Sequence, residues 1–161
     1  MPGKQKIRTC LWFDGNAEEA ATYYTSIFKN SKILGTTLYG EGGLAPKGSV
    51  MTVDFQLEGQ DFVGLNGGPK FKFTDAISLV VDCDTQQEVD AFWSQLSAGG
   101  EEGPCGWLKD KFGLSWQIVP SILMRMLQDG DPARTQRVVN AVLQMKKIDI
   151  ARVERAYNDK R

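Results

Sequence analysis

Residues 11–20, Leu11-Trp12-Phe13-Asp14-Gly15-Asn16-Ala17-Glu18-Glu19-Ala20, are the stretch that decides the fold. Side chains alternate over residues 6–13, with Thr9, Leu11 and Phe13 on one side, which is typical of a β-strand. Asp14 and Gly15 suit a turn, and Asn16 followed three residues later by Glu19 has the spacing of a helix capping box. The stretch therefore predicts a strand, a tight turn and a helix that runs to about Phe28.

The same order of elements returns 69 residues further along the chain. Residues 76–83 predict a strand, and Thr85 with Glu88 forms a second capping box ahead of another apolar helix face. The blocks align residue by residue, since Asn16 falls on Thr85 and Tyr24 falls on Trp93. This self-similarity indicates an internal duplication. Because one such sheet cannot bury its apolar face alone, a second unit must cover it, from this chain or from a partner.

Further strand candidates complete the two blocks, at residues 33–39, 49–57 and 62–66 in the first and at residues 106–109 and 114–119 in the second. We therefore predict an α+β fold made of two βαβββ modules, the second of them shortened. Both belong to a single domain over residues 1–161, with module one at 5–69 and module two at 75–120. A C-terminal helical extension takes residues 121–161.

The extension begins with a short helix at Ile122–Leu127. Asp131 followed by Pro132 is a strong helix start and predicts a helix to about Lys146. Asp149 caps a final helix. The apolar stripes of these helices are too regular for a solvated arm, so we expect the extension to pack on the sheet or on a partner chain.

The composition is that of a globular protein. The 161 residues are 42% hydrophobic and 24% charged, which excludes a disordered chain. The net charge of -1 gives no general attraction to nucleic acid or to an anionic membrane. No apolar run approaches the length of a membrane span. We therefore expect neither nucleic acid nor membrane among the partners.

The chain contains no histidine, which excludes several classes of site. A Ser-His-Asp triad, a Cys-His pair and a histidine-ligated zinc or haem site cannot form. General acid–base work would fall to carboxylates, Lys, Tyr or Cys. Asp14 and Asp110 are placed to cap turns, a common role of Asp, and a catalytic role for either has no support.

The three cysteines, Cys10, Cys83 and Cys105, cannot all pair within the chain, and none forms a C-x-x-C motif. The first residues, Met1–Lys4, carry no sign of a signal peptide. Both observations favour a cytoplasmic chain with reduced thiols.

Three motifs make the chain similar to the PhnB-like, 3-demethylubiquinone-9 3-methyltransferase-like family of the vicinal oxygen chelate (glyoxalase/bleomycin resistance) superfamily. They are residues 11–31, residues 65–69 (Leu-Asn-Gly-Gly-Pro) and residues 110–120 (Asp-Lys-Phe-Gly-Leu-Ser-Trp-Gln-Ile-Val-Pro). The extension also resembles the family through residues 145–150. The resemblance implies paired modules whose mixed sheets curl into an open cup for a small ligand, in a homodimer.

Superfamily enzymes hold a divalent metal in this cup, and the resemblance places the ligand positions at Thr9, Asn66, Ser78 and Gln117. None of the four is His, Glu or Asp, and neutral hydroxyls and amides cannot compensate a divalent charge. We therefore predict no metal and no cofactor.

The same four side chains would form a polar spine in an otherwise apolar cup. One interpretation is that they orient a polar group on a ligand, as in ordinary small-molecule pockets; the other is that they bond to one another, to the backbone or to water. Trp107 and Phe112, which flank the second hairpin, are predicted ligand walls. The predicted ligand-binding residues are Thr9, Asn66, Ser78, Trp107, Phe112 and Gln117. Cys10 and Trp12 have the opposite parity to Thr9, so we expect them to point away from the cup.

The leading hypothesis is a cytoplasmic, homodimeric, metal-free protein that binds a small, largely apolar ligand. One alternative is a metal-dependent enzyme with unorthodox ligands, and another is a methyltransferase, as the family label suggests. A physical argument opposes the methyltransferase hypothesis, because no G-x-G-x-x-G turn leads from a strand into a helix to hold a nucleoside cofactor. A third alternative is a structural dimer whose cup is filled by its own side chains, so the sequence leaves open whether any reaction is catalysed.

Overall fold

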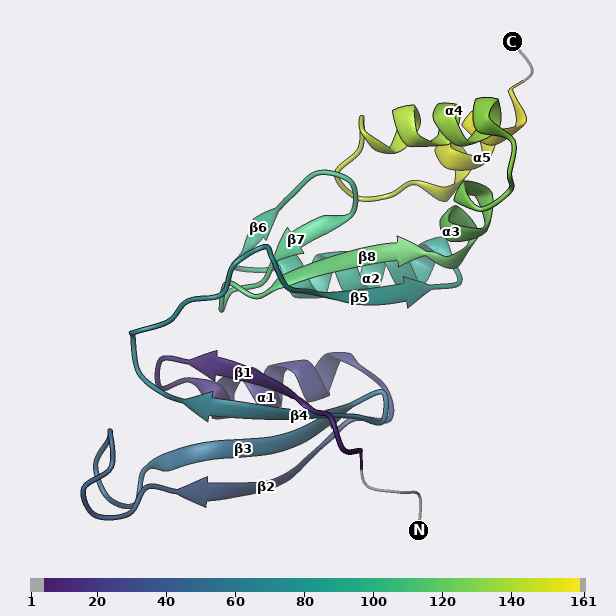
Figure 1. Cartoon of the computed structure of the whole chain (residues 1–161). Helices are drawn as coiled ribbons and strands as arrows, with labels where there is room; N and C mark the ends of the chain where they lie inside the picture. Colours follow the sequence, from purple (N-terminus) through teal and green to yellow (C-terminus); the bar gives the residue numbers. More distant parts are fainter. Residues whose placement is uncertain (1–4, 160–161) are drawn as a thin grey trace. The chain divides into compact units, whose positions relative to one another are not determined.

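The computed structural model describes residues 5–159, and the chain divides into two compact units between Lys72 and Phe73 (Figure 1). Each unit contains one of the two predicted modules, built in the order βαβββ. The duplication and the α+β class are thereby confirmed. Residues 1–4, used for the signal-peptide prediction, and the last two residues of the predicted extension lie outside the described residues.

The first unit has one helix and four strands: β1 (Thr9–Phe13), α1 (Ala17–Ile27), β2 (Lys32–Leu38), β3 (Val50–Leu57) and β4 (Gln60–Asn66). The strand order in its sheet is β1-β4-β3-β2, with β1 parallel to β4 and the other neighbours antiparallel. A parallel pair needs a long crossover between its strands, and α1 with the β2–β3 hairpin provides it. Helix α1 buries its small apolar residues and Tyr24 against this sheet.

The second unit repeats this topology with β5 (Ser78–Cys83), α2 (Gln86–Ser97), β6 (Glu101–Glu102), β7 (Trp107–Lys109) and β8 (Ser115–Pro120). Its strand order is β5-β8-β7-β6, again with one parallel pair, β5 and β8. Helix α2 packs on β7 and β8 through Val89, Trp93 and Leu96. The predicted shortening of this module lies in β6, which has two residues, and in β7, which has three.

The extension follows β8 directly and contains α3 (Ser121–Leu127), α4 (Pro132–Val142) and α5 (Ile150–Asn158). Asp131 and Asp149 cap α4 and α5 as predicted, since each side chain accepts backbone N–H groups of the first turn. The extension has a core of its own, formed by Leu123, Met126, Val138, Met145, Ile148 and Val153. It therefore packs as an integral part of the second unit.

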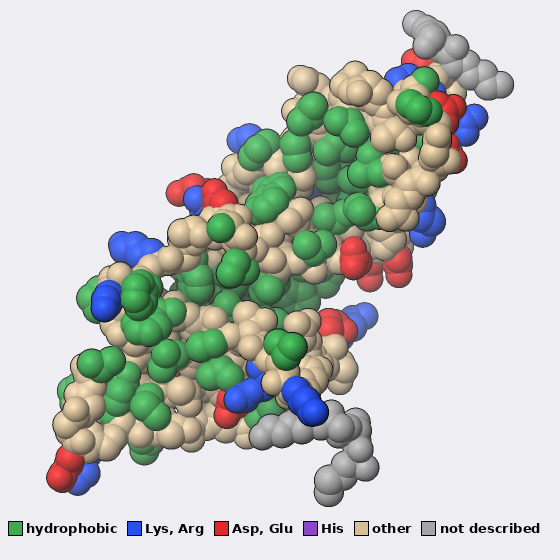
Figure 2. Space-filling view, in the orientation of Figure 1, with side chains coloured by type: hydrophobic (Ala, Val, Ile, Leu, Met, Phe, Trp, Pro, Cys, Tyr) green, Lys and Arg blue, Asp and Glu red, His purple; other side chains and the backbone are tan. Residues whose placement is uncertain are grey.

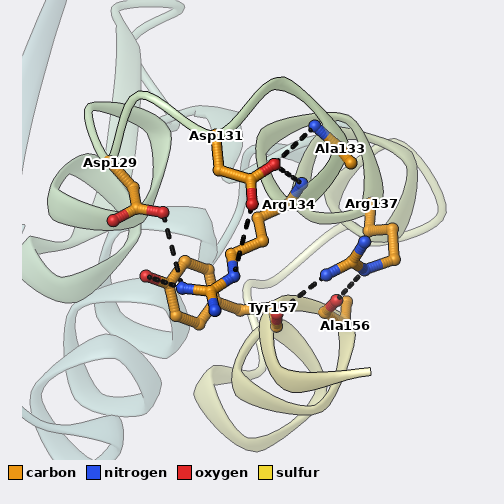
Figure 3. A network of polar contacts seen from close by, with 7 residues as sticks. All are labelled: Asp129, Asp131, Ala133, Arg134, Arg137, Ala156 and Tyr157. Atoms are coloured by element: carbon orange, nitrogen blue, oxygen red, sulfur yellow. Dashed lines mark hydrogen bonds and ion pairs between the residues drawn. The ribbon is translucent and has the colours of Figure 1, made fainter. Parts of the chain in front are cut away.

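A polar network joins α4 to α5 (Figure 3). The Arg137 guanidinium donates to the backbone carbonyls of Ala156 at 2.9 Å and Tyr157 at 3.1 Å. Arg134 lies over the Tyr157 ring and also contacts Asp131. Because two of the acceptors are carbonyls near the end of α5, the network fixes the two helices relative to each other.

Two local predictions were wrong. Helix α4 ends at Val142 rather than near Lys146, and residues 143–149 leave the helix to approach β7 and α2. Asn16 makes no side-chain hydrogen bond to cap α1. By contrast, the second capping box forms, with Thr85 Oγ1 accepting from Glu88 N at 3.2 Å and Glu88 Oε2 accepting from Asp84 N at 2.7 Å.

Several large apolar side chains remain exposed, including Ile33, Leu34 and Leu38 of the edge strand β2. Figure 2 shows hydrophobic side chains reaching the visible surface over the C-terminal helices. Across residues 5–159, no helix has the length and apolar character needed to cross a bilayer.

Candidate functional site

In the first sheet, the side of β1 that carries Thr9 is the side that α1 covers. Leu11 and Phe13 are buried there, and Thr9 shares their parity. Cys10 and Trp12 lie on the open face, so the predicted orientation of β1 was wrong. The alternation itself contained the signal, because the side with Leu11 and Phe13 is the one that must be buried under the helix.

Asn66, at the end of β4, caps α1 from a distance in sequence. Its Oδ1 accepts from Ala17 N at 2.9 Å, and its Nδ2 donates to the carbonyl of Val50 at 3.1 Å. One of the free backbone N–H groups in the first turn of α1 is thus satisfied by a strand residue 49 positions away. Both ends of the Asn66 amide are engaged in holding the helix, the strand and the β3 backbone together.

In the second sheet, Ser78, Trp107 and Gln117 lie on the open face. Val80 and Trp107 are the register partners of Gln117 on β5 and β7, and Ser78 lies two residues from Val80 on the same face. The Gln117 Nε2 donates to the Ser78 Oγ at 2.9 Å. These two predicted residues therefore bond to each other across the parallel strand pair.

A hollow of about 480 Å³ lies on this open face, within the second unit. We call it the sheet-two hollow; it is lined by Asp75, Glu101, Glu102, Gly103, Pro104, Cys105, Trp107, Leu108, Lys109 and Ser115. Its lining combines the apolar side chains of Pro104, Trp107 and Leu108 with four ionisable side chains, those of Asp75, Glu101, Glu102 and Lys109. An apolar enclosure with a few convergent polar groups is the usual construction of a small-molecule site.

The polar part of the sheet-two hollow is an ion pair supported by a hydroxyl. Lys109 Nζ lies 3.3 Å from Asp75 Oδ1, and the Ser115 hydroxyl donates to the same oxygen at 2.9 Å. The Ser115 hydrogen bond, and then Lys109, lower the pKa of the Asp75 carboxyl below its usual value. The carboxylate, the ammonium and the hydroxyl thus form one preorganised group that can orient a ligand's polar end.

Phe112 does not line this hollow; it lies half-buried in the turn between β7 and β8. Asp110 organises that turn from a position only 2% exposed. Its Oδ1 accepts from the backbone N–H groups of Phe112 and Leu114, at 2.8 and 3.1 Å, and its Oδ2 accepts from the Trp116 indole at 2.8 Å. The predicted turn-capping role of Asp110 is confirmed, and the motif at residues 110–120 is explained largely by this structural turn.

A second hollow, of about 680 Å³, lies in the first unit at the carboxyl ends of β1 and β4. Asp14, Glu18 and Asn66 line it together with the backbone of two glycine-containing loops. Asn66 is already satisfied on both sides, and the remaining walls are irregular loop. It has no aromatic wall, so the sheet-two hollow is the better candidate for an apolar ligand.

The metal that superfamily enzymes carry does not fit these residues. Of the four expected ligand positions, Asn66 serves as a helix cap, while Ser78 and Gln117 bond to each other. Within residues 5–159, no group of three or more His, Cys, Asp or Glu side chains converges as a metal site would require. The donors present are neutral and already engaged, which is the wrong chemistry for a divalent ion.

A nucleoside cofactor meets a similar difficulty. The turn from β1 into α1 contains one glycine, Gly15, and the turn from β5 into α2, at residues 84–85, contains none. A Rossmann-type cradle needs several glycines there so that the backbone can approach the cofactor closely. Neither crossover helix of this chain offers that cradle.

Of the residues that line the sheet-two hollow, the sequence predicted Trp107 as a ligand wall; it named Lys109 only as an ionisable candidate and gave Asp75 and Ser115 no role. Lys109 could have been found from its parity, because it lies two residues from Trp107 on a predicted strand. Asp75 precedes β5 in an irregular segment, and only the folded register brings it to Ser115.

A family model and one solved structure indicate the same family. The model of the family described as 3-demethylubiquinone-9 3-methyltransferase matches residues 5–119. No curated protein matches the chain.

Among solved structures, the chain is similar to a candidate 3-demethylubiquinone-9 3-methyltransferase, the PhnB protein of Bacillus cereus, with 38% identity, a TM-score of 0.65, and coverage of 73% of this chain and 100% of that chain. Protein PA1353 of Pseudomonas aeruginosa is 17% identical, with a TM-score of 0.60 over 73% of this chain and 98% of that chain. The fosfomycin resistance protein FosX of Listeria monocytogenes, solved with Mn(II) and sulfate, is 14% identical, with a TM-score of 0.55 over 81% of this chain and 99% of that chain. At their low identities, the last two show the fold alone.

Proposed function

The chain belongs to the 3-demethylubiquinone-9 3-methyltransferase family, a PhnB-like branch of the vicinal oxygen chelate superfamily, and from that premise we propose that it binds a small, largely apolar molecule without a metal ion. The observation that carries the proposal is the sheet-two hollow, in which Trp107 stands near the Asp75–Lys109–Ser115 group. Sequestration in such a hollow needs no acid–base group, which suits a chain without histidine.

We assign the predicted residues different roles in this function. Trp107 forms the aromatic wall, and the Ser78–Gln117 pair extends the polar surface of the same sheet face. The other three predicted residues serve the fold. Asn66 caps a helix, Thr9 lies on the helix-covered side of β1, and Phe112 belongs to a turn. The ligand therefore has an apolar body for Trp107 and one hydrogen-bonding group for Ser115 and Asp75.

The test uses 1-naphthalenemethanol, which has an apolar bicyclic body and one hydroxyl. Titration into the ¹⁵N-labelled chain should shift the backbone amide signals of residues 103, 105–109 and 115. Trp107→Ala should weaken binding about tenfold, because the probe loses its aromatic wall. Phe71→Ala removes an exposed aromatic of the first unit and is the matched control, which should leave the affinity unchanged.

The proposal fails if the probe shifts no amide of the second unit at millimolar concentration. It fails equally if the shifts centre on residues 14–18 and 66–68 of the first unit, or if Trp107→Ala and Phe71→Ala have the same affinity.

The family's name makes methyl transfer the second candidate. Its test is calorimetric titration with S-adenosylmethionine. Because neither strand-to-helix turn is glycine-rich, the backbone cannot approach a nucleoside cofactor closely there, and we expect no heat of binding; micromolar affinity would revive methyl transfer.

We further propose that the protein is a cytoplasmic homodimer. The exposed apolar residues Ile33, Leu34 and Leu38 on edge strand β2 favour a partner chain, and three free thiols favour a reducing compartment. Light scattering on the eluting protein tests the dimer, which the double change Ile33→Lys and Leu38→Lys should dissociate.

A further inference from the structure

One wall of the sheet-two hollow, the loop 103–106, is bonded to the C-terminal extension. The N–H of Cys105 donates to the carbonyl of Met145 at 2.8 Å, and the N–H of Gly106 donates to the carbonyl of Lys146 at 2.7 Å. These residues lie about 40 positions apart in sequence, so the extension returns to this loop after completing α4. We call residues 145–150 the bridging segment.

The loop 103–106 is also held from the sheet. Gly103 N donates to the Trp107 carbonyl at 2.8 Å, and Ile118 N donates to the Gly106 carbonyl at 2.8 Å. Cys105 and Gly106 both have left-handed backbones, with φ of 58° and 83°. A non-glycine residue in that region is strained and persists where its surroundings hold it, and here the bridging segment supplies part of that hold.

Contact at Gly106 is close enough to exclude a side chain. A Cβ added there would lie 2.8 Å from the Ile118 carbonyl oxygen and 3.2 Å from Ile148 Cγ1. Ile148 is 1% exposed and belongs to the core of the extension. The wall of the hollow therefore rests directly on the buried core of the extension.

The bridging segment is fastened on its other side to α2. The Gln86 side chain donates to the Ile148 carbonyl at 3.1 Å and accepts from Ile150 N at 2.8 Å. Lys147 Nζ lies 2.7 Å from Asp90 Oδ1. The segment thus joins a helix on the covered side of the sheet to the wall of a hollow on its open side.

We infer that the bridging segment is the positioning element of the sheet-two hollow, so that ligand occupancy and docking of the extension stabilise each other. The inference rests on the proposed function and deepens it. It assigns a role to a part of the chain that lies beyond residue 119, where the family match ends. Because linkage is reciprocal, a ligand that needs the wall in place must also tighten the segment that holds it.

The experiment measures hydrogen exchange and probe affinity on the full chain. Saturating 1-naphthalenemethanol should slow amide exchange at Cys105 and Gly106, and also at Ile150, whose amide bonds to Gln86 and which is not among the residues that line the hollow. Slowing at Ile150 is the readout that a merely structural role would not produce. Ile148→Asp, which places a charge in the extension's core, should weaken probe affinity about tenfold or more.

Gln86→Leu is the milder variant, which removes both side-chain hydrogen bonds to the segment and should weaken the affinity in the same direction. Arg137→Gln is the matched control, because it loosens α4 from α5 without touching the segment or the loop, and should bind normally. Unchanged exchange at Ile150, or normal affinity in a folded Ile148→Asp or Gln86→Leu variant, would overturn the inference while leaving the proposed function intact. Absence of probe binding to the unmodified chain would overturn both.

Discussion

The two units share one topology but cap their crossover helices in different ways. In the second unit the cap is local, since Thr85 accepts from Glu88 N within the first turn of α2. In the first unit the cap comes from Asn66, on the neighbouring strand. A duplicated fold can therefore conserve the arrangement of elements while the contacts that hold it differ between the copies.

The open faces of the two sheets also differ. In the first unit Trp12 is engaged by its own chain, since its indole N–H donates to the Gly68 carbonyl at 2.8 Å and its ring packs on Phe71. In the second unit Trp107 lines a hollow. Equivalent faces of the two copies thus serve to anchor a chain segment in one unit and to enclose space in the other.

The largest effect that we expect from a single substitution is that of Asp110→Ala in the second unit. It leaves three donors without their acceptor in the buried turn of the second unit, and we expect a loss of about 3 kcal/mol in the free energy of unfolding. Urea denaturation measures the loss. Glu41→Ala in the first unit is the control, because its ion pair with Lys47 is exposed and its removal should cost less than about 0.5 kcal/mol. Similar losses in both variants would contradict the assigned role.

A second test compares the caps. Asn66→Ala removes an acceptor for α1 and a donor to β3, and should cost about 2 kcal/mol. Thr85→Ala removes one bond and should cost about 1 kcal/mol. Thermal unfolding of the two variants should show the larger loss of stability for Asn66→Ala. Asn16→Ala should change stability by less than about 0.5 kcal/mol, and a larger effect would restore the local capping box.

The sequence was sufficient for the topology because the duplication repeats the order of strands and helix and the position at which each crossover helix starts. It was insufficient for the cap of α1, since Asn16 and Thr85 occupy matching positions and only the second forms its bond. The bond from Asn66 to α1 depends on the register of β1 against β4, which no local pattern encodes. The hollow depended on register in the same way, because Asp75 meets Ser115 only when β5 pairs with β8.

The cysteines of the two units provide a third test. Cys10 is exposed on the open face of β1, whereas Cys83 is buried, and burial raises the pKa of the Cys83 thiol to about 12. Burial also raises the pKa of Cys10, against the opposing charge of Arg8. At pH 8 iodoacetamide should modify Cys83 at least about tenfold more slowly than Cys10, as mass spectrometry of digested protein would measure. Equal rates would show that Cys83 is accessible.

The smallest expected effect concerns Asp75. Its pKa is lowered in the folded chain, so its contribution to stability is present above the unfolded carboxyl value of about 3.9 and is lost as the pH falls through the lower folded value. The carboxyl carbon signal of Asp75 should therefore titrate below that value. Ser115→Ala removes the largest cause and should raise the midpoint; an unchanged midpoint would contradict the assignment.

The core of the extension has a practical consequence for anyone preparing shorter versions of this protein. A fragment that ends at residue 119 would contain the whole family match. It would lack Ile148, which packs against Gly106. The newly exposed surface would be apolar, and the neighbouring loop 103–106 would lose its support. Both changes favour aggregation during expression. Any sensible cloning boundary for the second unit therefore lies beyond α5.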